Sequence, residues 1–174
     1  MNLPKLTLVL GGAASGKSFW AEQLVGRAGR PKAYIATAQA WDAEMQAKIA
    51  RHREMRGPLW RTIEAPRDVA STLGGILPTE TALLDCATLW LTNTMLAEAD
   101  LPTEEERLLA ALGACPAPVV VVSNELGLGL VPETALGRRF RDAQGRLNQR
   151  LATQADLVVF VAAGLPLVLK GVLP

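Results

Sequence analysis

Eight residues near the start of the chain have the types and spacing of a phosphate-binding loop. They read Gly11, Gly12, Ala13, Ala14, Ser15, Gly16, Lys17 and Ser18, which matches G-x-x-x-x-G-K-[ST]. In such a loop the backbone N–H groups and the positive end of the following helix face the phosphates. Lys17 would add a mobile positive charge, and the Ser18 hydroxyl is a ligand for Mg²⁺. A turn that binds nothing needs neither side chain, so the pattern predicts a nucleoside triphosphate site.

Asp85 is a second candidate, because it ends the apolar run Thr81 to Leu84. A carboxylate at the end of a buried strand can reach the metal beside a phosphate-binding loop. Taken alone, such an aspartate is as often a helix cap or a turn residue. The phosphate-binding loop favours the metal role, so we predict Ser18 and Asp85 as the ligands of Mg²⁺.

The single histidine, His52, follows Ile49 by three residues and Met45 by seven, along the apolar stripe of a predicted helix. A histidine in such a stripe is more often packed than catalytic. A neutral imidazole can nevertheless attack the α-phosphorus of a nucleotide and form a covalent phosphoramidate. The arginines around His52 are Arg51, Arg53 and Arg56. Their side chains could offset the charge of a phosphate or simply face water.

These residues need a scaffold of alternating strands and helices. We predict strands at Leu6–Leu10, Lys32–Thr37, Trp60–Glu64, Thr81–Asp85, Val119–Ser123 and Leu157–Val161. We predict a first helix that begins near Gly16 and ends around Gly26 to Gly29. Further helices are predicted around Trp41–Arg56, Leu89–Glu98, Glu104–Leu112 and Glu133–Ala155. Leu101-Pro102 and Pro116 to Pro118 are predicted as connections. Unbroken apolar strands between helices indicate an α/β fold with a mostly parallel sheet flanked by helices.

Composition restricts the class of protein. The 174 residues are 49% apolar and 20% charged, which predicts one globular domain over residues 1–174. The net charge of +1 lacks the basic excess typical of nucleic-acid binding. Two cysteines, Cys86 and Cys115, are too few for a disulfide framework or a zinc site.

No segment indicates secretion or membrane insertion. Leu6–Leu10 is too short for a secretory signal and leads into the glycine-rich loop. Leu157–Leu169 contains Gly164 and Pro166, is too short for a bilayer span, and is predicted as a buried strand plus a turn. We therefore expect a cytoplasmic protein.

Several segments together resemble one enzyme family. They read GGAASGKS, YIATA, DAEMQAKIARHR, WRTIEAP, SNELGLGLVPE and RRFRDAQGRLNQRLA, in this order from about Leu6 to Gly171. The sequence resembles the bifunctional adenosylcobinamide kinase and adenosylcobinamide-phosphate guanylyltransferase family of cobalamin biosynthesis. The resemblance implies a single-domain, RecA-like fold of the phosphate-binding-loop nucleoside triphosphatase type.

The resemblance also implies roles for residues. His52 would carry the guanylyl group, and Lys17 with Mg²⁺ would stabilise the transferring phosphoryl group. GTP contacts are implied for the loop Gly11 to Ser18 and for Ala36, Thr37, Ala38, Arg53, Glu54, Met55, Arg56, Glu64 and Asp85. Asp85 departs from the pattern because Glu is expected there as readily, and Arg51 stands where some relatives have a second histidine.

Two reactions follow from the resemblance. ATP or GTP would phosphorylate adenosylcobinamide, and GTP would then give GMP, through His52, to adenosylcobinamide-phosphate. The product would be adenosylcobinamide-GDP. A homotrimer is also implied, with active sites near subunit boundaries where Trp20 and Trp41 could contact a neighbour.

Other interpretations stay open from the residues alone. A simple small-molecule kinase would use Lys17 and Asp85 and give His52 no chemical role, and a nucleotide-switched binding module would release no small-molecule product. The segment Asn124 to Gly129 is either a ligand-binding loop or an ordinary turn. The basic helix after it carries Arg138, Arg139, Arg141, Arg146 and Arg150, and these face phosphate, a neighbouring subunit or water.

Overall fold

The computed structural model describes residues 1–39 and 59–174. The strands of this part are β1 (Leu6–Gly11), β2 (Lys32–Ala36), β3 (Trp60–Glu64), β4 (Thr81–Asp85), β5 (Val119–Asn124), β6 (Leu157–Ala162) and β7 (Leu165–Lys170). Its helices are α1 (Lys17–Gly26), α3 (Val69–Gly74), α4 (Ala87–Leu96), α5 (Leu101–Ala114) and α6 (Ala135–Gln154). The predicted helix Trp41–Arg56 lies outside the described residues.

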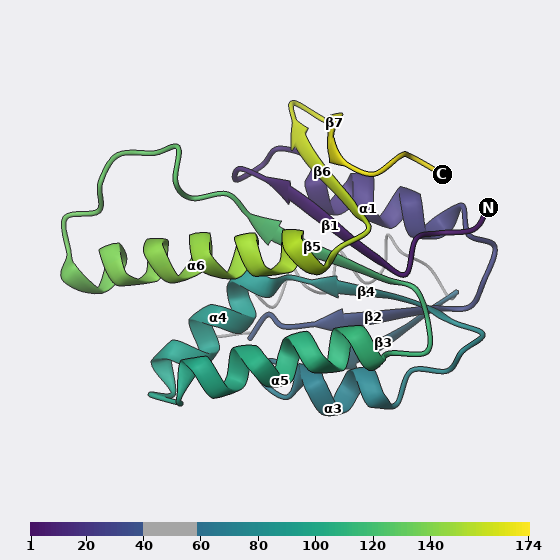
Figure 1. Cartoon of the computed structure of the whole chain (residues 1–174), viewed down its shortest axis with the longest axis horizontal. Coiled ribbons are helices and arrows are strands. Elements are labelled where there is room, and N and C mark those ends of the chain that lie inside the picture. The colour runs from purple at the N-terminus through teal and green to yellow at the C-terminus, as the bar shows by residue number, and fades with distance from the viewer. Residues whose placement is uncertain (40–58) are drawn as a thin grey trace.

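The described strands form one sheet in the order β3-β2-β4-β5-β1-β6-β7 (Figure 1). All neighbours pair in parallel except β6 and β7, which are antiparallel. Since parallel neighbours end at the same edge, the segments after β1, β2, β3, β4 and β5 meet there. The predicted α/β fold with a mostly parallel, helix-flanked sheet is confirmed.

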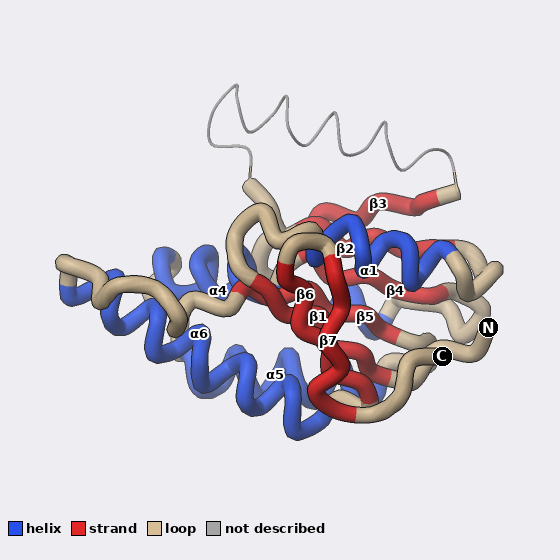
Figure 2. Tube along the Cα trace, turned by 90° about the horizontal axis from the view of Figure 1, so that it is seen from above, coloured by secondary structure: helices blue, strands red, loops and turns tan. Residues whose placement is uncertain are grey.

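Helices cover both faces of this sheet. Figure 2 shows α1 on one side and α5 and α6 on the other. Alternate residues of β1 follow this division, because Leu8 and Leu10 pack with α3, α4, α5 and α6, whereas Val9 packs with α1. Burial on both faces explains why the strands read as unbroken apolar runs.

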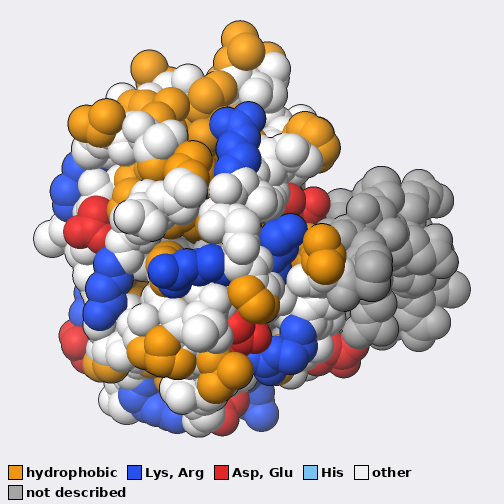
Figure 3. All heavy atoms as spheres, turned by 90° about the vertical axis from the view of Figure 1, so that its right-hand side faces the viewer, with side chains coloured by type: hydrophobic (Ala, Val, Ile, Leu, Met, Phe, Trp, Pro, Cys, Tyr) orange, Lys and Arg blue, Asp and Glu red, His pale blue; other side chains and the backbone are white. Residues whose placement is uncertain are grey.

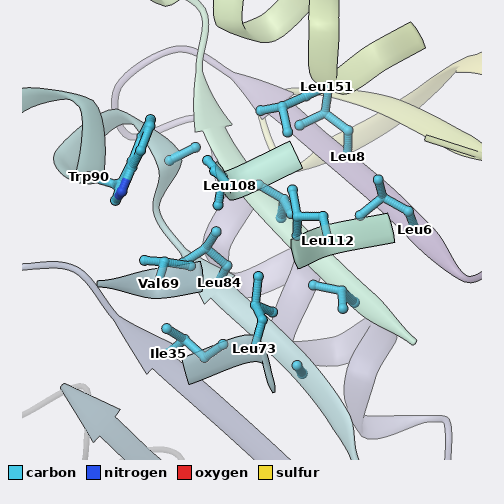
Figure 4. Packing of buried hydrophobic residues seen from close by; sticks show 14 of the residues in the cluster. Leu6, Leu8, Ile35, Val69, Leu73, Leu84, Trp90, Leu108, Leu112 and Leu151 are labelled. Atoms are coloured by element: carbon cyan, nitrogen blue, oxygen red, sulfur yellow. The ribbon is translucent and has the colours of Figure 1, made fainter. Parts of the chain in front are cut away.

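The larger core lies between the sheet and four helices. Trp90 of α4 is 1% exposed, and its indole N–H donates to the Arg67 carbonyl oxygen at 2.9 Å. Leu108 and Leu112 of α5 pack in the same cluster, as Figure 4 shows. Trp90 is therefore a structural residue, and truncating it would leave a large cavity.

Two predictions about elements were wrong, and one helix was missed. Leu101 and Pro102 do not form a connection but begin α5, because a proline in the first turn lacks only an N–H that no helical carbonyl would accept. The Leu157–Leu169 segment holds a second strand, β7, rather than only a strand and a turn. The short helix α3, which Asp68 caps through its side chain, was not predicted.

Strand β7 is exposed along its whole length. Its apolar side chains Leu165, Leu167 and Leu169 are 71%, 60% and 57% exposed. Figure 3 shows apolar side chains gathered at the top of the molecule, at the level of β7 in Figure 1. The sheet therefore has an apolar edge on this side.

None of the helices in residues 1–39 and 59–174 has the length and apolarity that crossing a bilayer requires. Both cysteines are buried and unpaired.

Candidate active site

The phosphate-binding loop joins β1 directly to α1. Gly16 caps the helix with a φ of 90°, a conformation that glycine adopts without strain. A Cβ added at Gly11 would lie 2.6 Å from the carbonyl oxygen of Val161, so close packing against β6 also requires glycine there. The Lys17 ammonium donates to the Gly12 carbonyl oxygen at 3.1 Å. The loop thus forms the turn that its sequence predicted.

Two neighbouring segments hold this loop in place. The N–H of Gly164, in the turn between β6 and β7, donates to the Ser15 carbonyl oxygen at 2.8 Å. On the other side, the N–H of Glu125 donates to the Gly11 carbonyl oxygen at 3.0 Å. The Ser15 hydroxyl is buried and has no hydrogen-bond partner among the described residues. The loop is therefore held at both ends by its strand neighbours.

The predicted acidic residues reach the same edge of the sheet. Asp85 is in register with Ala36, and Ala36 with Glu64. Strand β5 lies between β1 and β4, so Asp85 is separated from the loop by two strand spacings, about 10 Å. The Tyr34 hydroxyl donates to Asp85 Oδ2 at 3.0 Å. Nucleotide phosphates and a metal ion would bridge such a gap.

The segment after β2 is tied to the end of β4. The Thr37 hydroxyl donates to the Cys86 carbonyl oxygen at 2.8 Å and accepts from the Cys86 N–H at 2.7 Å. The side-chain amide of Asn93 donates to the carbonyl oxygens of Thr37 and Pro66 at 2.8 and 2.9 Å. The polar groups of Thr37 are thus engaged within the protein, and its contact with a nucleotide stays a prediction.

Cys86 reports the electrostatics at the end of β4. Burial, and after it the negative charge of Asp85, raise the pKa of its thiol to about 11. The positive charge of Lys17 acts in the opposite direction on the same thiol. The loop lysine and the strand-ending carboxylate are therefore close enough to act on one common group.

Asn124, at the end of β5, lies beside the phosphate-binding loop in register with Gly11. Its N–H donates to the Thr88 hydroxyl at 2.8 Å, and its carbonyl oxygen accepts from the Asn148 amide at 3.0 Å. Ser123 donates to Asn148 Oδ1 at 2.6 Å and accepts from Gln144 at 2.9 Å. A buried polar network from α4 and α6 thus fixes the strand end beside the loop.

The sequence did not single out these positioning residues. Gln144 and Asn148 lie four residues apart on the buried face of α6, among Ala143, Leu147 and Leu151. Two amides within such an apolar stripe are the signal that could have found them.

Some of the remaining predicted residues lie in the described part of the chain, and others lie outside it. Glu64 is exposed at the end of β3, and Ala36 ends β2 with Ala38 two residues on. His52, Arg53, Glu54, Met55 and Arg56 lie outside the described residues. Within the described part, no group of three His, Cys, Asp or Glu side chains could hold a metal ion by itself. A metal at Ser18 and Asp85 would thus need phosphate oxygens as further ligands.

Comparison with known proteins decides the family. The family model described as cobinamide kinase / cobinamide phosphate guanyltransferase matches residues 7–169. The chain belongs to this family. A bifunctional adenosylcobalamin biosynthesis protein, CobP, of Pseudomonas aeruginosa is 48% identical over 94% of this chain and 96% of its own length. The protein CobU of Salmonella typhimurium, also named bifunctional, is 41% identical over 95% of this chain and 99% of its own length.

Solved structures of more distant proteins share the fold of this cobinamide kinase and guanyltransferase family member. The RadB recombinase superposes with a TM-score of 0.55 at 20% identity, over 90% of this chain and 74% of its own. The protein PH0250 of Pyrococcus horikoshii gives 0.58 at 8% identity, over 99% of this chain and 89% of its own. The predicted fold type is therefore confirmed.

Proposed function

We propose that this protein phosphorylates adenosylcobinamide and then transfers GMP from GTP to adenosylcobinamide-phosphate, giving adenosylcobinamide-GDP. Membership of the family supports both activities. The observation that carries the proposal is that the phosphate-binding loop, Asp85 and Glu64 all lie at one edge of the sheet.

In the kinase step, the loop Gly11 to Ser18 binds the phosphates of ATP or GTP through its N–H groups. Lys17 leaves the Gly12 carbonyl oxygen and pairs with the transferring phosphoryl group. The residues fit Mg²⁺, since Ser18 and Asp85 supply oxygen ligands and Tyr34 orients the carboxylate. When bound there, Mg²⁺ neutralises charge that develops on the phosphates.

In the guanylyl step, a ring nitrogen of His52 attacks the α-phosphorus of GTP. A P–N bond forms, the bond from the α-phosphorus to the bridging oxygen breaks, and pyrophosphate leaves. A phosphate oxygen of adenosylcobinamide-phosphate then attacks the same phosphorus, and the P–N bond breaks. The contacts implied for Ala36, Thr37, Ala38, Glu64 and the segment Arg53 to Arg56 would hold GTP for this step.

The test is covalent labelling. We expect purified protein incubated with Mg²⁺ and GTP labelled at the α-phosphate to keep the label after denaturation. The adduct should be acid-labile and alkali-stable, and His52→Ala should abolish it. His52→Ala should still transfer the γ-phosphate of ATP to adenosylcobinamide. A wild-type protein that transfers this phosphate but never carries GMP would instead be a simple kinase.

Two further properties belong to this proposal. We propose a homotrimer, which the family resemblance implies and which would bury the apolar edge of β7. We also propose that the protein works in the cytoplasm, which the unpaired, buried cysteines support. Light scattering coupled to size-exclusion chromatography measures the mass of the assembly directly.

A further inference from the structure

A hollow of about 170 Å³ opens beside the phosphate-binding loop. It is lined by Phe19, Trp20, Gln23, Leu24, Arg27 and Gly164. Five of these belong to α1 and its C-terminal end, and the sixth lies in the turn between β6 and β7. Gly164 also holds the phosphate-binding loop, but the five residues from α1 have no role in the site described above.

The hollow is continuous with the loop. Gly164 donates its N–H to the Ser15 carbonyl oxygen, and a Cβ added at Gly16 would lie 3.1 Å from the Gly164 Cα. Phe19 follows the loop lysine by two residues. A ligand held by the loop therefore needs only a short extension to enter the hollow.

The lining has the chemistry of a nucleobase site. Phe19 is 68% exposed, although it is a large aromatic side chain at the start of a helix. Gln23 and Arg27 follow at intervals of four, so they share its face of the helix. An aromatic ring offers a stacking surface to a planar base, and the amide and guanidinium groups can bond to the base edge.

The order of the strands sets the direction of the nucleotide. Asp85, the predicted metal ligand, lies on the β5–β4 side of β1, whereas the hollow lies on the β6–β7 side. Terminal phosphates placed between the loop and Asp85 therefore leave the nucleoside end free to run toward the hollow. Thr37 and Glu64 are implied in GTP binding for guanylyl transfer. Thr37 follows β2 and Glu64 ends β3, both on the side away from the hollow.

We propose that this hollow binds the purine base of the nucleotide that donates the phosphoryl group, with Phe19 as the stacking surface. The inference rests on the proposed kinase function and gives the donor a base site separate from the contacts of the guanylyl step. Stacking tolerates either purine, since both present a flat π-face. Such a site admits ATP and GTP alike.

The test compares ligands with and without a base. Dissociation constants for ATP, GTP and inorganic tripolyphosphate are measured by calorimetry, with Mg²⁺, for the wild type, Phe19→Ala, Phe19→Trp and Leu77→Ala. Leu77 is a matched control, because it is 58% exposed and precedes β4, at the far end of that strand from the site.

We expect Phe19→Ala to weaken ATP and GTP by about 5-fold to 100-fold, the range for loss of one stacked base. Tripolyphosphate binding should stay unchanged. Phe19→Trp should bind both nucleotides as the wild type does, and Leu77→Ala should change nothing.

Three results would overturn the inference. Nucleotide binding could be unaffected by Phe19→Ala, or tripolyphosphate could weaken in parallel, which would indicate damage to the loop. Phe19→Ala could instead lower the mass of a wild-type oligomer in light scattering, which would assign the hollow to a subunit contact. A wild type that binds neither nucleotide nor tripolyphosphate would refute the proposed function itself, and so would be distinguishable from these.

Discussion

Asp85 shows how a side chain with a proposed role can be oriented by a neighbour that the sequence did not mark. One carboxylate oxygen accepts from the Tyr34 hydroxyl, and Tyr34 lies one strand away on β2. The hydrogen bond limits rotation of the carboxylate before any ligand arrives. An oriented carboxylate loses less conformational freedom when it binds a cation.

Asp85→Asn should lower the affinity for Mg²⁺, because an amide oxygen lacks the negative charge of a carboxylate. We expect the free Mg²⁺ concentration that gives half-maximal phosphorylation to rise at least about tenfold. Tyr34→Phe is the control, since it keeps the carboxylate and should cause a smaller rise. An unchanged magnesium dependence in Asp85→Asn would remove this residue from the metal site.

Because of Cys86, the free energy of unfolding should depend on pH in the alkaline range. Its thiol has an ordinary pKa of 9.0, which burial raises to about 11. Between these values the unfolded chain loses a proton that the folded protein keeps, so stability falls as pH rises through this window. Each unit of the shift corresponds to about 1.4 kcal/mol.

Cys86→Ser removes this titration and keeps an acceptor for the Leu89 N–H that the thiol now accepts. We expect the free energy of unfolding of Cys86→Ser, relative to the wild type, to improve by roughly 1 to 2 kcal/mol between pH 8 and pH 10.5. Urea unfolding at both pH values measures it. A difference that stays constant with pH would show that the thiol does not titrate in this way.

At the scale of elements, α6 supports the site through its buried amides. Asn148 bonds to Ser123, Gln144 and the carbonyl oxygen of Asn124. Removing the amide takes the acceptor from the buried Ser123 hydroxyl and a donor from the Asn124 carbonyl oxygen, and only the bond from Gln144 to Ser123 remains. A buried polar group that loses its partner costs more than the bond itself contributes.

Asn148→Ala should therefore lower the free energy of unfolding by about 2 kcal/mol. It should also weaken tripolyphosphate binding, since the end of β5 donates to the phosphate-binding loop through the Glu125 N–H. Gln149→Ala, on the exposed side of the same helix, should do neither. A stable Asn148→Ala with full affinity would show that the network contributes little.

Elements with strong local signals were predictable, and those set by tertiary contacts were not. The glycines and lysine of residues 11–18 placed β1, the loop and α1 correctly, because their conformation is local. The helix start at Leu101-Pro102 was misjudged, since the same dipeptide suits a connection and a first helical turn. The residues of β7 do not alternate between polar and apolar, so their sequence lacked the signal of a strand with one buried face. Both faces of this strand are exposed.

For the candidate site, the sequence predicted where some side chains lie but not which neighbours orient them. Asp85 and Glu64 could be placed at strand ends, and parallel pairing brought those ends together. Which side chains orient them depended on strand order, which periodicity does not encode. Tyr34, Thr88 and Asn93 were for this reason not predicted.

At the scale of the whole molecule, the exposed edge of β7 has a consequence for assembly. Leu167 is 60% exposed on a strand whose outer side has no neighbour in the described sheet. Leu167→Lys places a charge on this edge, which opposes pairing with another chain.

If β7 contributes to the proposed trimer, Leu167→Lys should shift the mass in light scattering from three chains toward one. The fold should remain, because the side chain is exposed, and the circular dichroism spectrum should not change. Lys5→Ala, at an exposed position before β1, serves as the control. A wild type that is already monomeric would contradict the trimer.

The order of the strands also governs how the protein emerges from the ribosome. Strand β1 is made first, yet its two sheet neighbours, β5 and β6, come more than 100 residues later. The glycine-rich turn after β1 gains its last backbone contact only when Gly164 has been made. Nascent chains shorter than this should not retain a nucleotide, because contacts this distant in sequence form late in folding. We therefore expect nucleotide binding only after Gly164 has been made.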